Sequence, residues 1–252
     1  MNKRRKRLKT KNMVILLLLS LIVVFVSFGF FMNPQKGEGE DKQPSLASKT
    51  VAKKDHAGKC NYVLMDTGDV NQIKIGAYQG CETVSLYNAL VYLNKTHDKS
   101  VKEVLDSLPL VGWDGNPNLG YAGDPWTPDD QIPDGGFPTI WPDAFMKFAQ
   151  SYGANVVDIS GKSIDDIKNI VLKEHLVEMW VTVDFAQPQI TYTDYFGHEV
   201  VTNTHAVILD GYDAKKKEFH VNDPIKGKYW LPESTVSSVY MGTNQFAVEF
   251  VS

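Results

Sequence analysis

Residues 80–86 read Gly80-Cys81-Glu82-Thr83-Val84-Ser85-Leu86. From here to about Lys95 apolar residues recur at helical spacing, so this stretch predicts a helix with Cys81 in its first turn. Unpaired backbone N–H groups and the helix dipole at that position favour a thiolate, which is the reactive form of cysteine. Glu82 in the same turn is stabilised by the dipole, and we interpret it as structural. The stretch therefore predicts a nucleophile on an early helix.

A nucleophilic cysteine needs a base, and the base needs an orienting group. Of six histidines, His205 is singled out because it is the first residue of the apolar run 205–212. This run predicts a buried strand with a polar residue at its start, where it could face a cleft. Taken alone, a histidine at a strand start is more often structural. Residues 218–223 predict a second strand that ends at Asp223, because Pro224 cannot continue a strand ladder. The order of cysteine, histidine and aspartate along the chain is that of a papain-type site.

A disulfide between the two cysteines is the alternative to a nucleophile. Cys60 and Cys81 are the only cysteines in the chain, and such a pair in an exported domain often forms a bridge. The position of Cys81 after a glycine at a helix start argues for a free thiol instead.

The remaining periodicity predicts helices in the first part of the domain and strands in the last third. Ser100 and Glu103 have the spacing of a capping box at the start of the second helix. Helices are expected over residues 81–95, 100–108, 141–152 and 163–174, and strands over 61–65, 155–159, 177–185, 200–209, 218–221 and 246–251. This order of elements predicts an α+β fold.

Residues 111–138 predict a long loop rich in glycine and proline. So long a loop inside a compact domain is more often functional than idle. Its bulky aromatic residues could line a substrate cleft or pack over the core of the domain, and the sequence favours neither: Trp113, Tyr121 and Trp126.

Composition and charge exclude several classes of protein. The 252 residues are 43% hydrophobic and 22% charged, which excludes a disordered or collagen-like chain. The formal net charge of −4 hides an asymmetry, because residues 1–12 hold seven basic residues while residues 60–252 hold 13 basic and 26 acidic residues. So acidic a domain would repel phosphate backbones, and we predict no nucleic-acid partner.

The N-terminal part predicts a membrane anchor. Residues 13–32 are twenty consecutive residues without a charge, which as a helix just span a bilayer core. The basic segment 1–12 is expected to stay in the cytoplasm, so everything after residue 32 is expected outside it. Residues 33–59 lack apolar periodicity and predict a solvated tether. Residues 60–252 then form one extracytoplasmic domain at the cell membrane.

A cleaved signal peptide, which would give a secreted form, is the alternative to the anchor. Signal peptides have a shorter apolar stretch followed by small residues. Here Phe30, Phe31 and Met32 occupy the place of those small residues, although Ser45-Leu46-Ala47 could serve as a late cleavage site.

Four pieces of the domain, in this order, resemble a known family. They are residues 80–86; Gly115-Asn116-Pro117-Asn118 with Gly123-Asp124-Pro125; His205-Ala206-Val207 with Gly211-Tyr212-Asp213; and Asn222-Asp223-Pro224 followed by Gly227. Together they are similar to the bacterial C39-like family of papain-like cysteine peptidases, related to the leader-peptide-cleaving domains of bacteriocin exporters. The resemblance runs from about Asn71 to Gly227 and implies a papain-like fold. It places the catalytic cysteine on a helix in the N-terminal helical part and the histidine and aspartate on a C-terminal antiparallel sheet.

The resemblance also implies roles for individual residues. Cys81 is the expected nucleophile, His205 the base that later protonates the leaving amine, and Asp223 the orienting acid. Asn222 is the alternative orienting residue, although as a strand neighbour of Asp223 it should face the other way.

An amide side chain upstream of the cysteine is expected to help hold the oxyanion. Gln72 is our choice and Gln79 the rival, since a side chain only two residues before the cysteine would struggle to reach back over its N–H. The segment 73–78 lacks the proline-rich spacing expected of the family.

The implied activity is hydrolysis of a peptide bond through a thioester intermediate, on a peptide or protein substrate. No cofactor is expected, and no metal, since the acidic residues of the long loop lack calcium-loop spacing and no zinc-type pairs of cysteine or histidine occur. Two alternatives stay open: a cell-wall peptide amidase or endopeptidase, and a catalytically inactive papain-like module that binds peptide or glycan.

Overall fold

The computed structural model describes residues 50–251. The predicted basic segment 1–12, the predicted anchor 13–32 and the tether as far as residue 49 lie outside this range. Within it, none of the helices has both the length and the apolar character needed to cross a membrane.

The sheet is organised around the ten-residue strand β7 (Thr204–Asp213). Strands β4 (Leu176–Thr182) and β2 (Cys60–Met65) pair with successive parts of one edge, and β8 (Glu218–Asp223) pairs with the other edge, all antiparallel. The sheet continues outward through four further strands: β1 (Thr50–Lys54), β10 (Ala247–Phe250), β3 (Val156–Asp158) and β9 (Gly227–Pro232). Strand β7 is therefore the element that brings the two later parts of the predicted site together.

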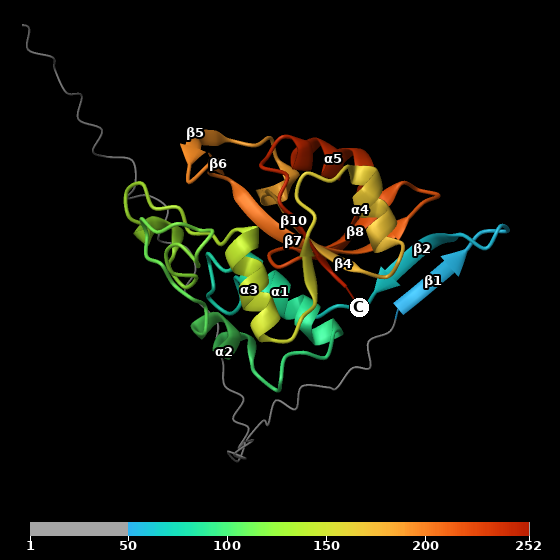
Figure 1. Cartoon of the computed structure of the whole chain (residues 1–252), viewed down its shortest axis with the longest axis horizontal. Coiled ribbons are helices and arrows are strands. Elements are labelled where there is room, and N and C mark those ends of the chain that lie inside the picture. The colour runs from blue at the N-terminus through green and yellow to red at the C-terminus, as the bar shows by residue number, and fades with distance from the viewer. Residues whose placement is uncertain (1–49, 252) are drawn as a thin grey trace, which may run out of the picture. The chain divides into compact units, whose positions relative to one another are not determined.

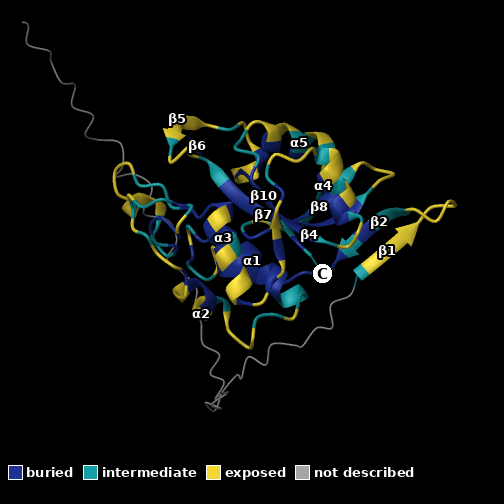
Figure 2. Cartoon of the chain, viewed as in Figure 1, coloured by how far each residue is buried: buried dark blue, intermediate teal, exposed yellow. Residues whose placement is uncertain are grey.

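The helices cover the two sides of the central strands (Figure 1). Helices α1 (Cys81–Tyr92) and α3 (Pro142–Ser151) lie on one side, with the short α2 (Val101–Asp106) beside α1. Helices α4 (Ile164–Val171) and α5 (Glu233–Met241) lie on the other. Because both faces of the sheet are covered, every residue of β4 is buried, and Figure 2 shows α1 and β7 as the buried centre of the molecule.

The predicted helices and most predicted strands are present. The predicted capping box is confirmed, because the Ser100 hydroxyl accepts from the Glu103 amide and the Glu103 carboxylate accepts from the Ser100 amide. The predicted strand 177–185 ends at Thr182, since Asp184 and Phe185 have φ values of 62° and 51°. The predicted strand 200–209 is two strands, with a turn at residues 202–203 between them.

The predicted start of the domain at residue 60 is wrong. Residues 50–54, which the sequence assigned to the tether, form β1 and pair with β2. The turn between them closes because the Asp55 carboxylate accepts from the Ala57 and Lys59 amides. Residues 51–54 are all exposed, so both faces of β1 meet solvent and the strand has no apolar alternation to detect.

Several other elements were predicted only in part or not at all. A polar hairpin of β5 (Ile190–Tyr195) and β6 (His198–Val201) projects from the sheet and is largely exposed in β5. Strand β9, helix α5 and two 3₁₀ turns, η1 (Asp129–Gln131) and η2 (Val183–Phe185), were also missed. None of them alters the α+β order, in which α1 to α3 precede the main strands.

Candidate active site

Three of the four predicted site residues line a single cavity of about 450 Å³. Gln72 and Cys81 enter it from the loop before α1 and from the first turn of α1, and His205 enters it from the first residues of β7. The fourth, Asp223, lies directly behind His205 at the end of β8. The pairing of β7 with β8 and the packing of α1 on β7 thus bring residues that are far apart in the sequence into one site.

Helix α1 is fixed against β7 by a buried hydrogen bond. The Ser85 hydroxyl donates to the Ala206 carbonyl at 3.1 Å. Cys81 lies four residues before Ser85, one turn earlier on the same helical face. The contact with the neighbour of His205 therefore sets where the Cys81 side chain emerges.

The histidine and the aspartate form a buried pair. His205 Nε2 lies 2.9 Å from Asp223 Oδ1, and both side chains are 2% exposed. The Asp223 carboxylate also accepts from the Ile225 and Lys226 amides and from the Tyr229 hydroxyl. Burial raises the pKa of Asp223, but the hydrogen bond and charge of His205 and the two amides outweigh it and bring the pKa to about 2. Asp223 is thus a carboxylate under any physiological condition.

This pairing determines which nitrogen of His205 is available. Because Nε2 bonds to Asp223, Nδ1 is the nitrogen left to exchange a proton at the cavity. Asn222, the alternative orienting residue, faces away: its amide donates to Thr67 Oγ1 and to the Gly68 carbonyl.

The Cys81 thiol donates to the Glu82 carboxylate, with Sγ 3.2 Å from Oε2. Desolvation of the sulfur, followed by the charge and hydrogen bond of Glu82, raises the pKa of Cys81 well above its ordinary value. The amides of Ala206 and Glu82 lower the same pKa but do not offset these causes. Glu82 turns inward rather than to solvent, so its carboxylate opposes the thiolate that the helix start was expected to favour.

Gln72 is held in the cavity wall by hydrogen bonds to two segments of the chain. Its backbone N–H donates to the Pro224 carbonyl, and its side-chain Nε2 donates to the Tyr78 carbonyl at 3.0 Å. The buried Oε1 has no partner among residues 50–251. Gln79, the rival, uses its side-chain amide on the Thr127 carbonyl and on the Asp129 carboxylate. Nε2 of Gln72 keeps a second hydrogen for a bound group, whereas the Gln79 amide is committed to the loop.

The second cysteine does not take part in the site. Cys60 and Cys81 are both free thiols, so no disulfide joins them. The Cys60 thiol donates to the Tyr62 carbonyl within β2.

Three aromatic residues of the long loop, Trp113, Tyr121 and Trp126, pack instead of lining the cavity, whereas Phe137 near the end of the loop lines it. The Tyr121 hydroxyl donates to the Gln79 carbonyl, and Trp126 Nε1 donates to Asp106 of α2 at 3.1 Å. The loop folds over Trp113 so closely that a Cβ at Gly123 would lie 2.7 Å from the indole ring. The second half of the loop therefore forms part of the cavity wall, through Asp129, Ile132 and residues 136–138. Residues 50–251 contain no cluster of three or more side chains suited to hold a metal.

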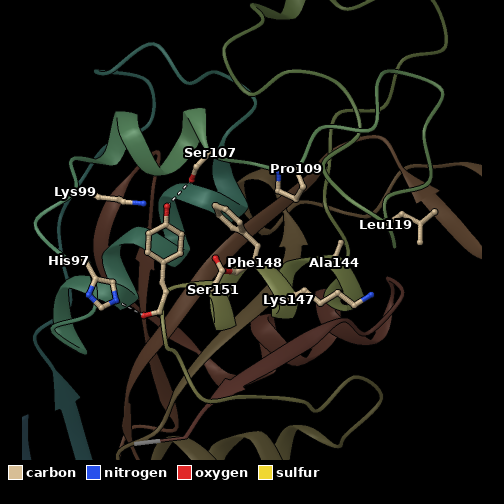
Figure 3. Close-up of a pocket in the computed structure, with 10 residues that line it drawn as sticks. His97, Lys99, Ser107, Pro109, Leu119, Ala144, Lys147, Phe148 and Ser151 are labelled. Carbon is tan, nitrogen blue, oxygen red and sulfur yellow. Dashed lines mark hydrogen bonds between the residues drawn. The ribbon is translucent and has the colours of Figure 1, made fainter.

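A second cavity, of about 560 Å³, lies between α3 and the segments around α2 (Figure 3). It contains serines and a histidine but no nucleophile paired with a base. His97 Nε2 contacts the Tyr152 carbonyl, Ser107 bonds the Tyr152 hydroxyl, and Ser151 donates to the Phe148 carbonyl. The chemistry of the molecule is therefore at the first cavity.

Two buried glutamates were missed from the sequence, one bonded to Cys81 and one close to the first. Glu82 was interpreted as a helix-start carboxylate, yet it is 1% exposed and bonded to the Cys81 thiol. Glu178 falls in the middle of a predicted strand and is fully buried. A lone glutamate within an otherwise apolar strand, Leu176–Thr182, was the available signal.

Comparison with solved structures supports the fold. A crystal structure described as a C39-like peptidase from Bacillus anthracis aligns with a TM-score of 0.62 at 22% identity, over 74% of this chain and 95% of that chain. A double glycine motif protease from an AMS/PCAT transporter, in complex with the leader peptide, aligns with a TM-score of 0.39 at 17% identity over 69% and 86% of the two chains. Xylellain, a cysteine protease from Xylella fastidiosa, aligns with a TM-score of 0.26 at 18% identity over 42% and 43%. Only the first of these alignments bears on the fold.

Comparison at the level of sequence gives the family. No protein with a curated description matches the chain. The profile of the Peptidase_C39 like family matches residues 65–248, which include the whole site described above. The expected papain-like α+β fold and the expected enzyme class are thereby confirmed. This chain belongs to the Peptidase_C39 like family and is a cysteine-type peptidase.

Proposed function

We propose that this chain is a membrane-anchored, extracytoplasmic peptidase with Cys81 as nucleophile, His205 as base and Asp223 as orienting acid. The observation that carries the proposal is the buried 2.9 Å bond between His205 Nε2 and Asp223 Oδ1, at a cavity that Cys81 also lines. An imidazole held in this way presents its other nitrogen to a thiol. The same three residue types in this arrangement support acyl transfer.

The first half of the reaction cleaves the peptide bond. His205 Nδ1 takes the proton of the Cys81 thiol, and the thiolate attacks the carbonyl carbon of the substrate. When the tetrahedral intermediate collapses, the C–N bond breaks and His205 returns the proton to the leaving amine. The acyl group stays on Cys81 as a thioester.

The second half releases the acyl group. His205 takes a proton from a water molecule, whose oxygen attacks the thioester carbonyl, and the C–S bond breaks to give a carboxylic acid and the restored thiol. Asp223 stabilises the imidazolium formed in both halves without changing its own protonation, in line with its pKa of about 2.

Two donors are placed to hold the oxyanion of the intermediate. The backbone N–H of Cys81 belongs to the first turn of α1, where amides have no partner within the helix. The second hydrogen on Gln72 Nε2 is the other donor. Donors of this kind stabilise the charge that develops in the transition state.

The walls of the cavity support an extended peptide with apolar side chains as substrate. Ile73 and Tyr78, which come from the loop before α1, are 44% and 42% exposed, and Val183 of η2 is 39% exposed. Apolar side chains left exposed at a cleft mark a binding surface. We expect apolar residues in the substrate beside the cleaved bond.

The location outside the cytoplasm is supported by the sequence. Residues 13–32 are long and apolar enough for one membrane crossing, and the basic residues before them favour a cytoplasmic N-terminus. The catalytic domain then faces away from the cytoplasm.

Peptide cleavage by the purified full-length chain tests the catalytic proposal. A mixture of synthetic peptides is incubated with the enzyme, and the new termini are identified by mass spectrometry. We expect cleavage by the native chain and by Cys60→Ser, which removes the other thiol, and no cleavage by Cys81→Ser or His205→Ala. Cleavage that persists in Cys81→Ser would contradict the proposal.

A further inference from the structure

Two buried glutamates interact with each other near the site: Glu82, which contacts Cys81, and Glu178, which is close enough to Glu82 to be affected by its charge. Glu82 is the second residue of α1 and is 1% exposed, and Glu178 is the third residue of β4 and is 0% exposed. Carboxyl groups are almost never fully buried unless they are paired. Neither glutamate forms an ion pair among the described residues.

Glu82 has the surroundings of a carboxylate. Its Oε1 accepts from Thr139 Oγ1 at 2.6 Å and from the Ile140 amide at 3.3 Å, and its Oε2 accepts from the Cys81 thiol at 3.2 Å. Three donors directed at one carboxyl group favour its charged form, although burial raises the pKa of Glu82. The negative charge of this site therefore belongs on Glu82.

Glu178 has the opposite surroundings. On β4 it shares a face with Trp180, whose Nε1 donates to the carbonyl of Ile140, the residue whose amide reaches Glu82. Neither oxygen of Glu178 has a partner among residues 50–251. Burial, and then the charge of Glu82, raises the pKa of Glu178 well above its ordinary value. Glu178 therefore carries a proton when Glu82 does not.

Few other titratable groups act on this pair. Tyr121 of the long loop is buried, and its raised pKa, due first to burial and then to the charges of Glu82 and Cys81, keeps the phenol neutral. Cys81 itself faces Glu82 from α1. His205 is bonded to Asp223, and no hydrogen bond joins it to the Cys81 thiol in the described structure. Among residues 50–251 no ion pair offsets the charge of Glu82.

We propose that Glu82 is a positioning residue that holds the Cys81 thiol protonated in the free enzyme, and that Glu178 lies beneath it as a neutral acid that keeps the pair at a single negative charge. The inference rests on the proposed function, since it takes Cys81 as nucleophile. On activation the thiol proton moves to His205 Nδ1, and Glu82 keeps its bonds to Thr139 and Ile140. The thiolate so formed is repelled by Glu82 and moves toward the cavity.

Alkylation of Cys81 as a function of pH tests the role of Glu82. The full-length chain with Cys60→Ser, whose only thiol is Cys81, is treated with iodoacetamide, and the rate is followed by intact mass. In Glu82→Gln, which keeps the size and a carbonyl acceptor, we expect the midpoint of the rate profile to fall by about one pH unit or more. The rate at pH 7 then rises about tenfold. Glu103→Gln, which removes an exposed carboxylate from α2, is expected to leave the profile unchanged.

Glu178→Gln tests the neutral acid. A neutral amide in place of a neutral acid should leave the Cys81 profile unchanged, whereas a fall in the midpoint would mean that Glu178 is charged and would overturn that part of the proposal. If Glu82→Gln does not fold, the infrared spectrum of the native chain at pH 7 still tests whether Glu178 is protonated. We expect the carbonyl band of a protonated carboxylic acid in the native chain, and we expect this band to be absent in Glu178→Gln.

The role of Glu82 and the catalytic roles of Cys81 and His205 are tested by different outcomes. An unchanged midpoint in folded Glu82→Gln overturns the role of Glu82 even when peptide cleavage still requires Cys81 and His205. Cleavage that survives in Cys81→Ser overturns the proposed function whatever the alkylation profile shows.

Discussion

At the scale of single residues, Cys81 is subject to two opposed influences from its own helix turn. The helix dipole stabilises a negative charge there by about 0.3–1 kcal/mol. A carboxylate at about 4 Å, with an effective dielectric constant of about 20, disfavours the same charge by on the order of 4 kcal/mol. Because Glu82 lies within hydrogen-bond distance of the sulfur, the carboxylate prevails and the resting cysteine is a thiol.

Asp223 gives a prediction at the same scale. In Asp223→Asn the amide can no longer stabilise the imidazolium of His205, so we expect peptide cleavage to fall roughly 10²-fold or more, measured as kcat/KM. The control is Asp213→Asn, which alters a carboxylate that accepts only from the exposed Lys215 and Lys216 amides. Activity near the native level in Asp223→Asn would rule out the orienting role.

The depressed pKa of Asp223 also predicts how stability depends on pH. The folded pKa of about 2 lies below the unfolded value of about 3.9, so the carboxylate stabilises the fold above pH 3.9, and this stabilisation is lost as the pH falls toward 2. Urea unfolding at pH 5 and pH 2.5 should show a larger loss in the native chain than in Asp223→Asn, by about 2 kcal/mol at most. Equal losses in both proteins would contradict the low pKa.

At the scale of elements, the site depends on how α1 sits on β7. The bond from Ser85 to the Ala206 carbonyl is the buried polar contact between these two elements, one helical turn from the nucleophile. Strand β7 also carries His205 and pairs with the strand that ends at Asp223. A shift of α1 along β7 would therefore move the nucleophile against a fixed base.

Ser85→Ala tests this dependence. The substitution leaves the buried Ala206 carbonyl without its side-chain donor, so we expect the free energy of unfolding to fall by about 1–3 kcal/mol in urea titration. We also expect a larger change in kcat than in KM, because the Cys81 thiol is no longer held at a fixed position relative to His205. Ser107→Ala, which removes a half-buried hydroxyl in the second cavity, should lower stability without changing kcat.

The sequence predicted those parts of the structure that depend on local chemistry. Cys81 at a helix start, the Ser100 cap and the end of β8 at Asp223 each follow from a few adjacent residues. The contacts that were missed join distant segments: Glu82 meets Thr139 only after folding, and β1 becomes a strand only by pairing with β2. Gln72 was preferred to Gln79 from its reach to the cysteine alone. The bonds of the Gln79 side chain to Thr127 and Asp129 could not be predicted, because the long loop meets Gln79 only after folding.

At the scale of the whole molecule, the chain combines a basic start, an apolar segment and an acidic catalytic domain. If residues 13–32 anchor the chain, the full-length protein expressed in bacteria should sediment with membranes and be released by detergent but not by high salt. External protease added to cells stripped of their wall should degrade the catalytic domain. A chain without residues 1–32 should stay in the soluble cytoplasmic fraction, and a full-length chain found there would refute the anchor.

The distance along the chain between Cys81 and its two partners has a consequence for how the protein is made. The nucleophile lies on α1, whereas His205 and Asp223 lie on β7 and β8, which follow only after the long loop, α3, α4 and β4. During synthesis the cysteine leaves the ribosome well before the histidine proposed as its base is made. If the proposed roles hold, a nascent or truncated chain that ends before β7 cannot cleave a peptide. On the proposed roles of Cys81 and His205, an unfinished chain therefore poses no proteolytic risk to neighbouring proteins.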